Sequence, residues 1–588
     1  MSDFIFSKKS ITRGKLTKEI QSIYHQDRPI VKEMHGDWGS LAVSYNLYNG
    51  FQPFETIDHI CIVIGGPVLG FQDNEFLVND SGVTGTQAIY ERWVNNIIQW
   101  DEDLSGPFVI LLINKVTWNV TCVTDLMSFI PVFTYVDSSN LILSTHVDML
   151  ARLSDQQDEI DLVSKADFIL HSVVTFPYTS YTHLRQIEPA TVHTIQRGSN
   201  QLQSKAYWTP EEKIVYESID QASDDLRDGL QNYVNKITKS MSHVAQFISG
   251  GEDSRLLSAL LPYECTRDAF IFLDHMNIEG KLAKRAAETY GASFNLATRS
   301  KTHYLEILPA CSDLVGSDSQ YANVHTFVFH KRCKLNEYSA VFGGLFSDAL
   351  FKGSRIKKVG GQGLFPFLPH IKDRNYSPGI KLENSAFTDE VLLELTKRRQ
   401  AHLQYVSSFR SESAEEWFEL WPTSMNSSIP NLHGNRRLFR SYEPFMAKEV
   451  VKLSAIVPQS WKLNRKLFHN TVKPLLEPTK WLMNSDGRYP YFPWYINSLP
   501  QFIVWFYQQV GRRTGLIKRN QGSWAEWNVV MKSSAWQQAI SEYSDGLKGL
   551  KNVFVDKDVG KLFSEGNLNK KQRMNLLQVL YYLHNKTI

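Results

Sequence analysis

The sequence lacks the features of a disulfide-rich, zinc-binding or membrane-spanning protein. Its 588 residues include five cysteines, which are widely spaced, odd in number and contain no CxxC pair. This pattern favours neither a disulfide framework nor a zinc site, and it fits a reducing compartment. No apolar run approaches the ~20 residues that a membrane-spanning helix needs, and the N-terminus has no basic-then-apolar signal pattern. We therefore expect a cytoplasmic protein with no membrane partner.

An excess of charge of one sign is also missing. The chain has 63 Lys and Arg against 61 Asp and Glu, which gives a formal net charge of +2. Global electrostatics therefore gives no reason to expect nucleic acid as a partner. What the chain does have is a globular composition, 43% hydrophobic and 21% charged, with enough length for two or three cores.

Residues 243–261, HVAQFISGGEDSRLLSALL, are the most informative stretch. A short apolar run is followed by two glycines and then by leucines at helical spacing, which predicts a strand, a tight turn and a helix. Glycine lets the backbone approach a ligand closely, and a helix N-terminus attracts anions. The stretch therefore predicts a phosphate-binding loop, and an ordinary turn with a helix cap is the alternative. The candidate nucleotide contacts are Ser249, Gly250, Gly251, Asp253, Ser254 and Arg255.

The segments after this loop alternate between strand and helix patterns. Residues 268–274 read as a buried strand that ends in Asp274, residues 279–290 as a helix, and residues 293–296 as the next strand. Such alternation predicts a parallel sheet with helices on both faces. Ligands bind at the carboxyl ends of such strands, so we expect Asp274 beside the loop.

The first 208 residues instead read as short strands separated by turns. Several strands are apolar throughout, which predicts two sheets packed face to face. Helices at about 86–100 and 164–173 are expected to cover the sheets. The apolar runs lie at 57–65, 108–113, 119–124, 132–136 and 141–144.

Three stretches of the second half resemble known motifs. SGGEDSR at 249–255 is similar to the SGGxDS loop of the ATP-pyrophosphatase superfamily. SAVFGGLFSDALFKG at 339–353 resembles the S-G-E-G-S-D-E-L-F-G-G motif of asparagine synthetases. YEPFMAKEVV, which begins at residue 442, resembles the R-x-P-F-L-D segment of the same family. The chain thus resembles the asparagine synthetase and beta-lactam synthetase-like family.

The resemblance implies ATP and Mg²⁺ as cofactors. Asp253 and Asp348 would bind Mg²⁺ on opposite sides of the triphosphate, and Asp348 would take part in catalysis. Gly344 and Ser347 match the second motif and would contact the nucleotide. Lys466 falls where the family places a lysine that stabilises the adenylated intermediate. The alternatives are helix capping by Ser347 or Asp348 and a solvated helix lysine at 466.

Segments of the first half, at 104–113, 125–135 and 143–145, resemble the glutaminase-type domain of asparagine synthetases. The implied fold is of the α/β and α+β class. Residues 1–209 would form an Ntn-hydrolase-like αββα sandwich. Residues 210–588 would form a parallel-sheet PP-loop (adenine nucleotide alpha hydrolase-like) synthetase domain with a helical C-terminal part.

Departures from the family pattern carry chemical meaning. Ser2 stands where a glutaminase of this type needs an N-terminal cysteine, and Leu126 replaces an arginine. We therefore predict that the first domain keeps its fold and has lost glutamine hydrolysis. Leu345 replaces the glutamate of asparagine synthetases and the tyrosine of beta-lactam synthetases. Leucine cannot accept a proton, so the base must lie elsewhere.

The function implied is adenylation of a carboxylate by ATP, followed by attack of an amine to form an amide. Beta-lactam synthetases and lasso-peptide cyclases are the expected analogues, in specialised metabolism such as antibiotic biosynthesis. The substrate would be a small molecule or peptide, and a carrier or partner protein and the oligomeric state are left open. The alternatives are a nucleotide-binding pseudoenzyme, a glutamine- or ammonia-dependent asparagine synthetase, and a PP-loop enzyme that modifies nucleic acid. Three arginines are further candidates for substrate phosphate or carboxylate: Arg436, Arg437 and Arg440.

Overall fold

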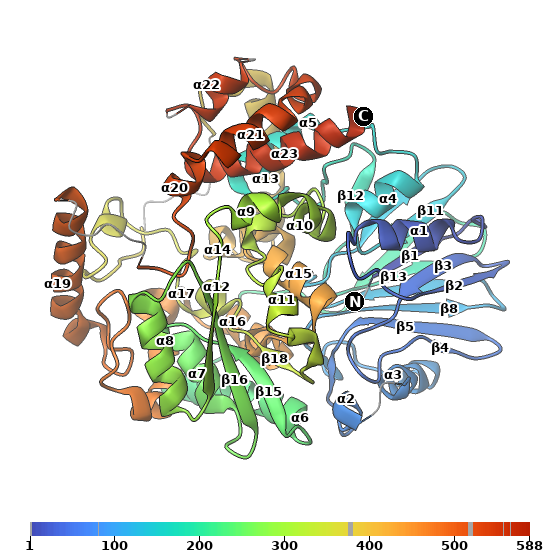
Figure 1. Ribbon diagram of the computed structural model, residues 1–588. Coiled ribbons are helices and arrows are strands. Elements are labelled where there is room, and N and C mark those ends of the chain that lie inside the picture. The colour runs from blue at the N-terminus through green and yellow to red at the C-terminus, as the bar shows by residue number, and fades with distance from the viewer. Residues whose placement is uncertain are drawn as a thin grey trace.

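The computed structural model describes residues 3–79, 82–373, 380, 382–514, 521–556, 558–564 and 566–587. Two six-stranded antiparallel sheets lie on the N-terminal side of the molecule, and a five-stranded parallel sheet with helices forms the other side (Figure 1). The mixed α/β character predicted from the sequence is confirmed.

The two antiparallel sheets are built from segments that alternate along the chain. The first has the order β12-β10-β11-β1-β3-β2 and the second the order β14-β13-β9-β8-β5-β4. The first sheet consists of β1 (Phe4–Ser7), β2 (Val31–Gly36), β3 (Gly39–Ser44), β10 (Phe133–Val136), β11 (Leu141–Ser144) and β12 (Leu184–Gln186). The second consists of β4 (Phe54–Glu55), β5 (His59–Gly65), β8 (Phe108–Asn114), β9 (Val120–Thr124), β13 (Thr191–Ile195) and β14 (Leu202–Ala206).

Strand β8 shows why the strands are apolar on both faces. Val109, Leu111 and Ile113 point between the two sheets, whereas Ile110 and Leu112 join a cluster on the outer face of the second sheet. Helix α3 (Thr84–Val94) packs on that outer face. Helices α1 (Lys15–Ser22) and α4 (Val147–Leu153) cover the first sheet. The layers therefore have the αββα order that the sequence predicts.

The helix expected at 164–173 has a different role. It is α5 (Leu162–His171), and it packs chiefly against α13 (Asp389–Ser407) and α23 (Lys570–Thr587). Its apolar residues Phe168 and Ile169 belong to the core of the C-terminal helices. The prediction that this helix covers the sandwich is therefore wrong, and the predicted helical C-terminal part is confirmed.

The parallel sheet has the order β17-β16-β15-β18-β19, and all its pairs are parallel. Its strands are β15 (His243–Phe247), β16 (Thr266–Leu273), β17 (Ser293–Thr298), β18 (Val341–Phe342) and β19 (Ser441–Tyr442). The main crossover helices are α7 (Glu252–Leu260), after β15, and α8 (Ile278–Thr289), after β16. Because parallel strands end at the same edge, this edge is where a ligand site is expected.

One apolar core runs from the sandwich into the second half of the chain. Phe108 of β8 belongs to the same buried cluster as Leu226 and Tyr233 of α6 (Ile219–Thr238) and Val450 of α16 (Lys448–Ile456). Strand β14 ends at Ala206 and α6 begins at Ile219. The predicted domain boundary at 209 lies between these two elements and stays a prediction.

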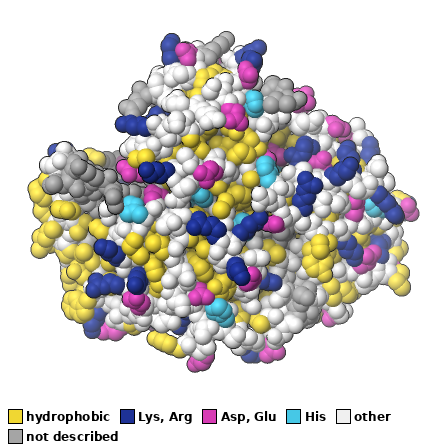
Figure 2. All heavy atoms as spheres, in the orientation of Figure 1, with side chains coloured by type: hydrophobic (Ala, Val, Ile, Leu, Met, Phe, Trp, Pro, Cys, Tyr) yellow, Lys and Arg dark blue, Asp and Glu magenta, His cyan; other side chains and the backbone are white. Residues whose placement is uncertain are grey.

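Helix α19 (Trp494–Arg513) lies at the periphery, on the left of Figure 1. Its outward side chains are apolar, and hydrophobic atoms cover this part of the surface in Figure 2. Tyr495, Leu499, Ile503 and Tyr507 are each more than half exposed. They are spaced four residues apart and therefore form one stripe along the helix. Within the described part of the chain, every helix is too short or too polar to cross a membrane.

Candidate functional site

The loop between β15 and α7 has the predicted strand–turn–helix form. The Ser249 N–H donates to Ser254 Oγ at 3.0 Å, and the Gly251 N–H donates to Ser249 Oγ at 3.1 Å. The Gly250 N–H donates to Glu279 Oε1 of α8 at 2.8 Å. A Cβ at position 250 would lie 3.0 Å from Leu282 Cβ, so glycine permits this close packing of loop against helix. These contacts fix the loop at the carboxyl end of the central strand.

A cleft of about 320 Å³ opens at this edge of the sheet. Ser249, Asp253 and Ser254 line it from the loop, and Gly344 and Leu345 line it from the segment after β18. Its size lies at the lower end of the range for small-molecule sites. The cleft therefore joins the predicted phosphate loop to the second predicted motif.

Two predicted residues at this edge have well-defined partners. Asp274 follows β16, and its Oδ1 lies 3.0 Å from Nε of Arg299, which lines the cleft. Arg255 points away from the cleft and is fully buried. It donates to the carbonyl oxygens of Gly250 at 2.7 Å and Leu482 at 2.6 Å. Arg255 therefore holds the loop from behind, and its contact with nucleotide stays a prediction.

The two predicted metal ligands meet around a lysine. Lys352 Nζ lies 2.5 Å from Asp253 Oδ1, 2.8 Å from Asp348 Oδ1 and 3.4 Å from Glu252 Oε1. The Lys352 side chain is only 3% exposed. Burial lowers the pKa of Lys352, but the carboxylates raise it by more, so its pKa lies above the ordinary value. The lysine is therefore a buried, charged residue that faces three carboxylates.

These residues do not fit a resident magnesium ion as they stand. The Lys352 ammonium fills the space between the carboxylates of Asp253 and Asp348. Among the residues that the structure describes, no group of three or more His, Cys, Asp or Glu side chains is arranged to hold a metal. Ser347, which precedes Asp348, is buried as the first residue of α12 (Ser347–Phe351).

Lys466 is the first residue of α18 (Lys466–Val472), is exposed and lies outside the residues that line the cleft. Its neighbour Arg465 forms an ion pair with Glu252. The catalytic role of Lys466 stays a prediction. The sequence did contain a signal for Lys352, because this lysine stands where the motif S-G-E-G-S-D-E-L-F-G-G has a glycine.

Glu443 is a second residue that sequence reasoning missed. It follows β19, is 1% exposed and lines the cleft. Burial raises the pKa of its carboxyl to about 8, although hydrogen bonds to its carboxylate act in the opposite direction. These come from the Leu345 N–H to Oε2 at 2.9 Å and from Ser441 Oγ to Oε1 at 3.2 Å. A carboxyl group with such a pKa can exchange a proton near neutral pH.

Gly343 keeps the space that the Glu443 carboxylate occupies. A Cβ at position 343 would lie 2.5 Å from Glu443 Oε2, so Gly343→Ala must displace this carboxylate. We expect Gly343→Ala to reduce amide formation at least about tenfold, with ATP affinity changed by less than about threefold. Product formation and nucleotide titration would measure the two effects. Gly360→Ala is the control, since its Cβ meets nothing within 4 Å. Equal losses in both variants would contradict this role of Gly343.

Two of the three arginine candidates for substrate binding bind another part of the protein. Arg436 and Arg437 lie on α15 (Pro430–Leu438), are buried and form ion pairs with Asp3 at 3.1 and 2.7 Å. Arg440 donates to Tyr338 O at 3.0 Å. A local basic pattern cannot reveal such partners, and the prediction of substrate contacts is wrong for Arg436 and Arg437.

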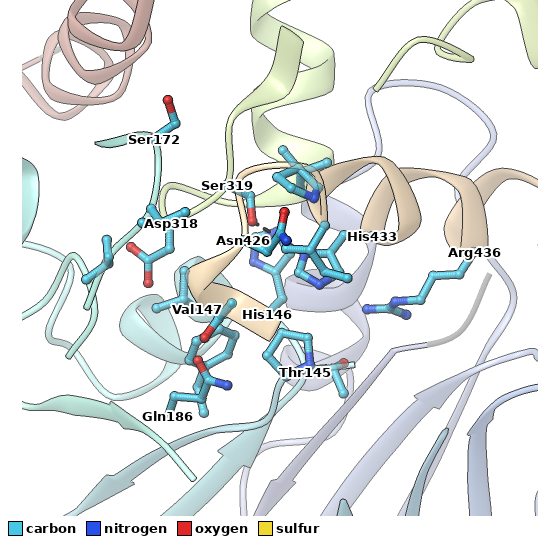
Figure 3. Close-up of a pocket in the computed structure, with 18 of the residues that line it drawn as sticks. Thr145, His146, Val147, Ser172, Gln186, Asp318, Ser319, Asn426, His433 and Arg436 are labelled. Atoms are coloured by element: carbon cyan, nitrogen blue, oxygen red, sulfur yellow. Dashed lines mark hydrogen bonds between the residues drawn. The ribbon is translucent and has the colours of Figure 1, made fainter. Parts of the chain in front are cut away.

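A small cavity lies beside this contact, between the sandwich and α15 (Figure 3). Thr145 and His146 line it from the sandwich side, and His433 and Arg436 line it from α15. Its volume of about 30 Å³ can hold ordered water but no amino acid. Ser2, the residue at the position of the glutaminase nucleophile, lies outside the described residues.

Comparison with known proteins identifies the second half. Residues 225–482 match the family model for asparagine synthase. No curated protein matches the chain. Among the solved structures that match, two are 10% identical to this chain over 50% of its length. One is an allosteric regulatory enzyme of purine biosynthesis (80% of that chain, TM-score 0.25). The other is glutamine phosphoribosylpyrophosphate amidotransferase from B. subtilis (65% of that chain, TM-score 0.22). The chain therefore contains an asparagine synthase domain at residues 225–482, and this domain indicates an asparagine synthetase-like ATP-dependent carbon–nitrogen ligase.

Proposed function

We propose that the protein is an AMP-forming amide ligase that joins a substrate carboxylate to a substrate amine. The observation that supports this most directly is the cleft itself. It is lined by the loop residues Ser249 and Ser254, which suit a phosphate, and by the buried carboxyl group of Glu443, which suits proton transfer. A ligase of this type needs both groups beside one substrate.

The first step is activation of the acid. The loop and the N-terminus of α7 bind the triphosphate of ATP, because a helix N-terminus favours anions. A carboxylate oxygen of the substrate attacks the α-phosphorus, the bond to the bridging oxygen of the β-phosphate breaks, and pyrophosphate leaves. The magnesium expected from the sequence would have to arrive with the nucleotide, because Lys352 occupies the space between Asp253 and Asp348.

The second step is attack of the amine on the acyl adenylate. Glu443 accepts a proton from the amine nitrogen, the nitrogen bonds to the acyl carbon, and AMP leaves. Leu345 lines the same cleft and contributes an apolar surface there. Glu443 thereby fills the role of base, which Leu345 cannot fill.

The nitrogen is proposed to come from a substrate amine, as in beta-lactam synthetases and peptide macrolactam formation. Ser2 is a weak nucleophile where a glutaminase would need cysteine. Its neighbour Asp3 is fully buried and forms ion pairs with Arg436 and Arg437. Loss of glutamine hydrolysis in the first domain is part of this proposal.

Pyrophosphate release from MgATP tests the proposal. The panel is amino acids, diamino acids and peptides, with glutamine hydrolysis followed in parallel. We expect substrate-dependent pyrophosphate, loss of this signal in Asp253→Ala and no ammonia from glutamine. ATP binding without turnover on any substrate would instead favour a nucleotide-binding pseudoenzyme. Ammonia release from glutamine coupled to asparagine formation would favour an asparagine synthetase.

A further inference from the structure

The positive charge of Lys352, the buried lysine of the phosphate site, is balanced by nearby carboxylates. Glu252 and Asp253 begin α7, and Asp348 lies one helical turn before Lys352. Glu252 also faces two arginines, in an ion pair with Arg465 and at 3.7 Å from Arg488. Arg488 in turn pairs with Asp486 at 2.7 Å. Three cationic side chains therefore offset most of the negative charge of four carboxylates, which leaves little to attract a divalent ion in the absence of nucleotide.

Geometry holds the ammonium of Lys352 in place. It lies over the ring of Phe468, with Nζ 4.5 Å from the ring centroid. The ammonium is within 2.8 Å of both Asp253 and Asp348. Mg²⁺ needs oxygen ligands at about 2.0–2.1 Å in an octahedral arrangement. An ammonium and a divalent ion cannot occupy this space together, because they would overlap and repel each other.

We propose that Lys352 is the resident cation of the phosphate site. Without nucleotide, its ammonium takes the place of a divalent ion between Asp253 and Asp348. With nucleotide, it binds the pyrophosphate portion of ATP directly. The second statement rests on the function proposed above, whereas the first concerns the free protein alone. Metal then enters only with the phosphates.

Titration of the free protein with Mn²⁺ tests the first statement, with free metal measured by electron paramagnetic resonance. The wild-type protein is expected to bind no Mn²⁺ at this site. Lys352→Met keeps the length of the side chain and removes its charge. We expect this variant to bind one Mn²⁺ ion at least about tenfold more tightly than any Mn²⁺ bound by the wild-type protein. The gain should vanish in a double variant that adds Asp348→Asn. Lys480→Met is the control, because Lys480 forms an exposed pair with Glu477.

Binding of inorganic pyrophosphate without metal, measured by calorimetry, tests the second statement. We expect binding to the wild-type protein and a loss of about tenfold or more in Lys352→Met. If that variant does not fold, as judged by circular dichroism, Lys352→Gly replaces it. Tight Mn²⁺ binding to the wild-type protein, or a folded variant that gains no site, would overturn the proposal. Failure to adenylate any acid would instead reject the proposed function and leave the Mn²⁺ result standing.

Discussion

Replacing Glu443 with glutamine is expected to slow amide formation by about 10²–10⁴-fold, the usual range for loss of a general base. Glutamine has nearly the same shape, and its carbonyl oxygen can still accept the hydrogen bond from the Leu345 N–H. It cannot accept a proton from the amine. Exchange of pyrophosphate into ATP should change by less than about threefold, because the amine takes no part in adenylation.

The pH dependence of amide formation distinguishes a role of Glu443 as base from a purely structural role. Burial raises the pKa of Glu443 to about 8, so the carboxyl becomes able to accept a proton as pH rises through that value. Amide formation by the wild-type protein should therefore rise with pH around 8, and this rise should be absent in Glu443→Gln. Glu449→Gln, at an exposed carboxylate on α16, is the control. An unchanged pH profile in Glu443→Gln would reject Glu443 as the base.

The same group makes a prediction about stability. The folded protein keeps a proton on Glu443 up to about pH 8, whereas the unfolded chain releases it near the ordinary value of 4.5. The unfolded state therefore binds fewer protons across this window, and stability falls as pH rises, by up to about 1.4 kcal/mol per pH unit. Glu443→Gln should remove this contribution, which denaturant midpoints at several pH values would measure.

The sequence predicts the phosphate loop well because its signals are local. The apolar run before Ser249, the glycine pair and the leucines after Asp253 all lie within 20 residues, and each has a direct steric or periodic meaning. The order of strands and helices follows for the same reason. Differences at element ends are small, as with the helix expected at 279–290, which is α8 and spans Ile278–Thr289.

The two residues that sequence reasoning missed depend on distant partners. Lys352 is charged and buried because Glu252 and Asp253, about a hundred residues earlier, meet it across the sheet edge. Glu443 has a raised pKa because strands β18 and β19 pair and enclose it beside Leu345. Lys352 does depart from the family motif, but neither its residue type nor its spacing reveals these partners, and the same holds for Glu443. To predict such residues, the strand and helix topology must be known first, because it determines which charged side chains meet.

Replacing Asp3 with alanine is expected to lower the free energy of unfolding by about 3–5 kcal/mol, the cost of leaving buried charges without their partner. Arg437 donates to Asp3 from Nε at 2.8 Å and from Nη2 at 2.7 Å, and Arg436 donates at 3.1 Å. Thr145 Oγ1 donates at 2.9 Å. Asp3 precedes β1 of the sandwich, and both arginines lie on α15, so the loss should weaken the junction seen in Figure 3.

The lowered pKa of Asp3 determines how this stabilisation changes with pH. Burial alone would raise it, but Arg437 and Arg436 lower it by more, so it lies well below its ordinary value. The stabilisation is therefore complete above the unfolded pKa of about 4 and is lost as pH falls below it. The difference in denaturation midpoint between wild type and Asp3→Ala should become smaller at acid pH.

Asp73→Ala is the control, because Asp73 pairs with Lys239 on the surface and its loss should leave the midpoint unchanged. Equal midpoints for Asp3→Ala and wild type at neutral pH would show that the buried cluster does not stabilise the junction.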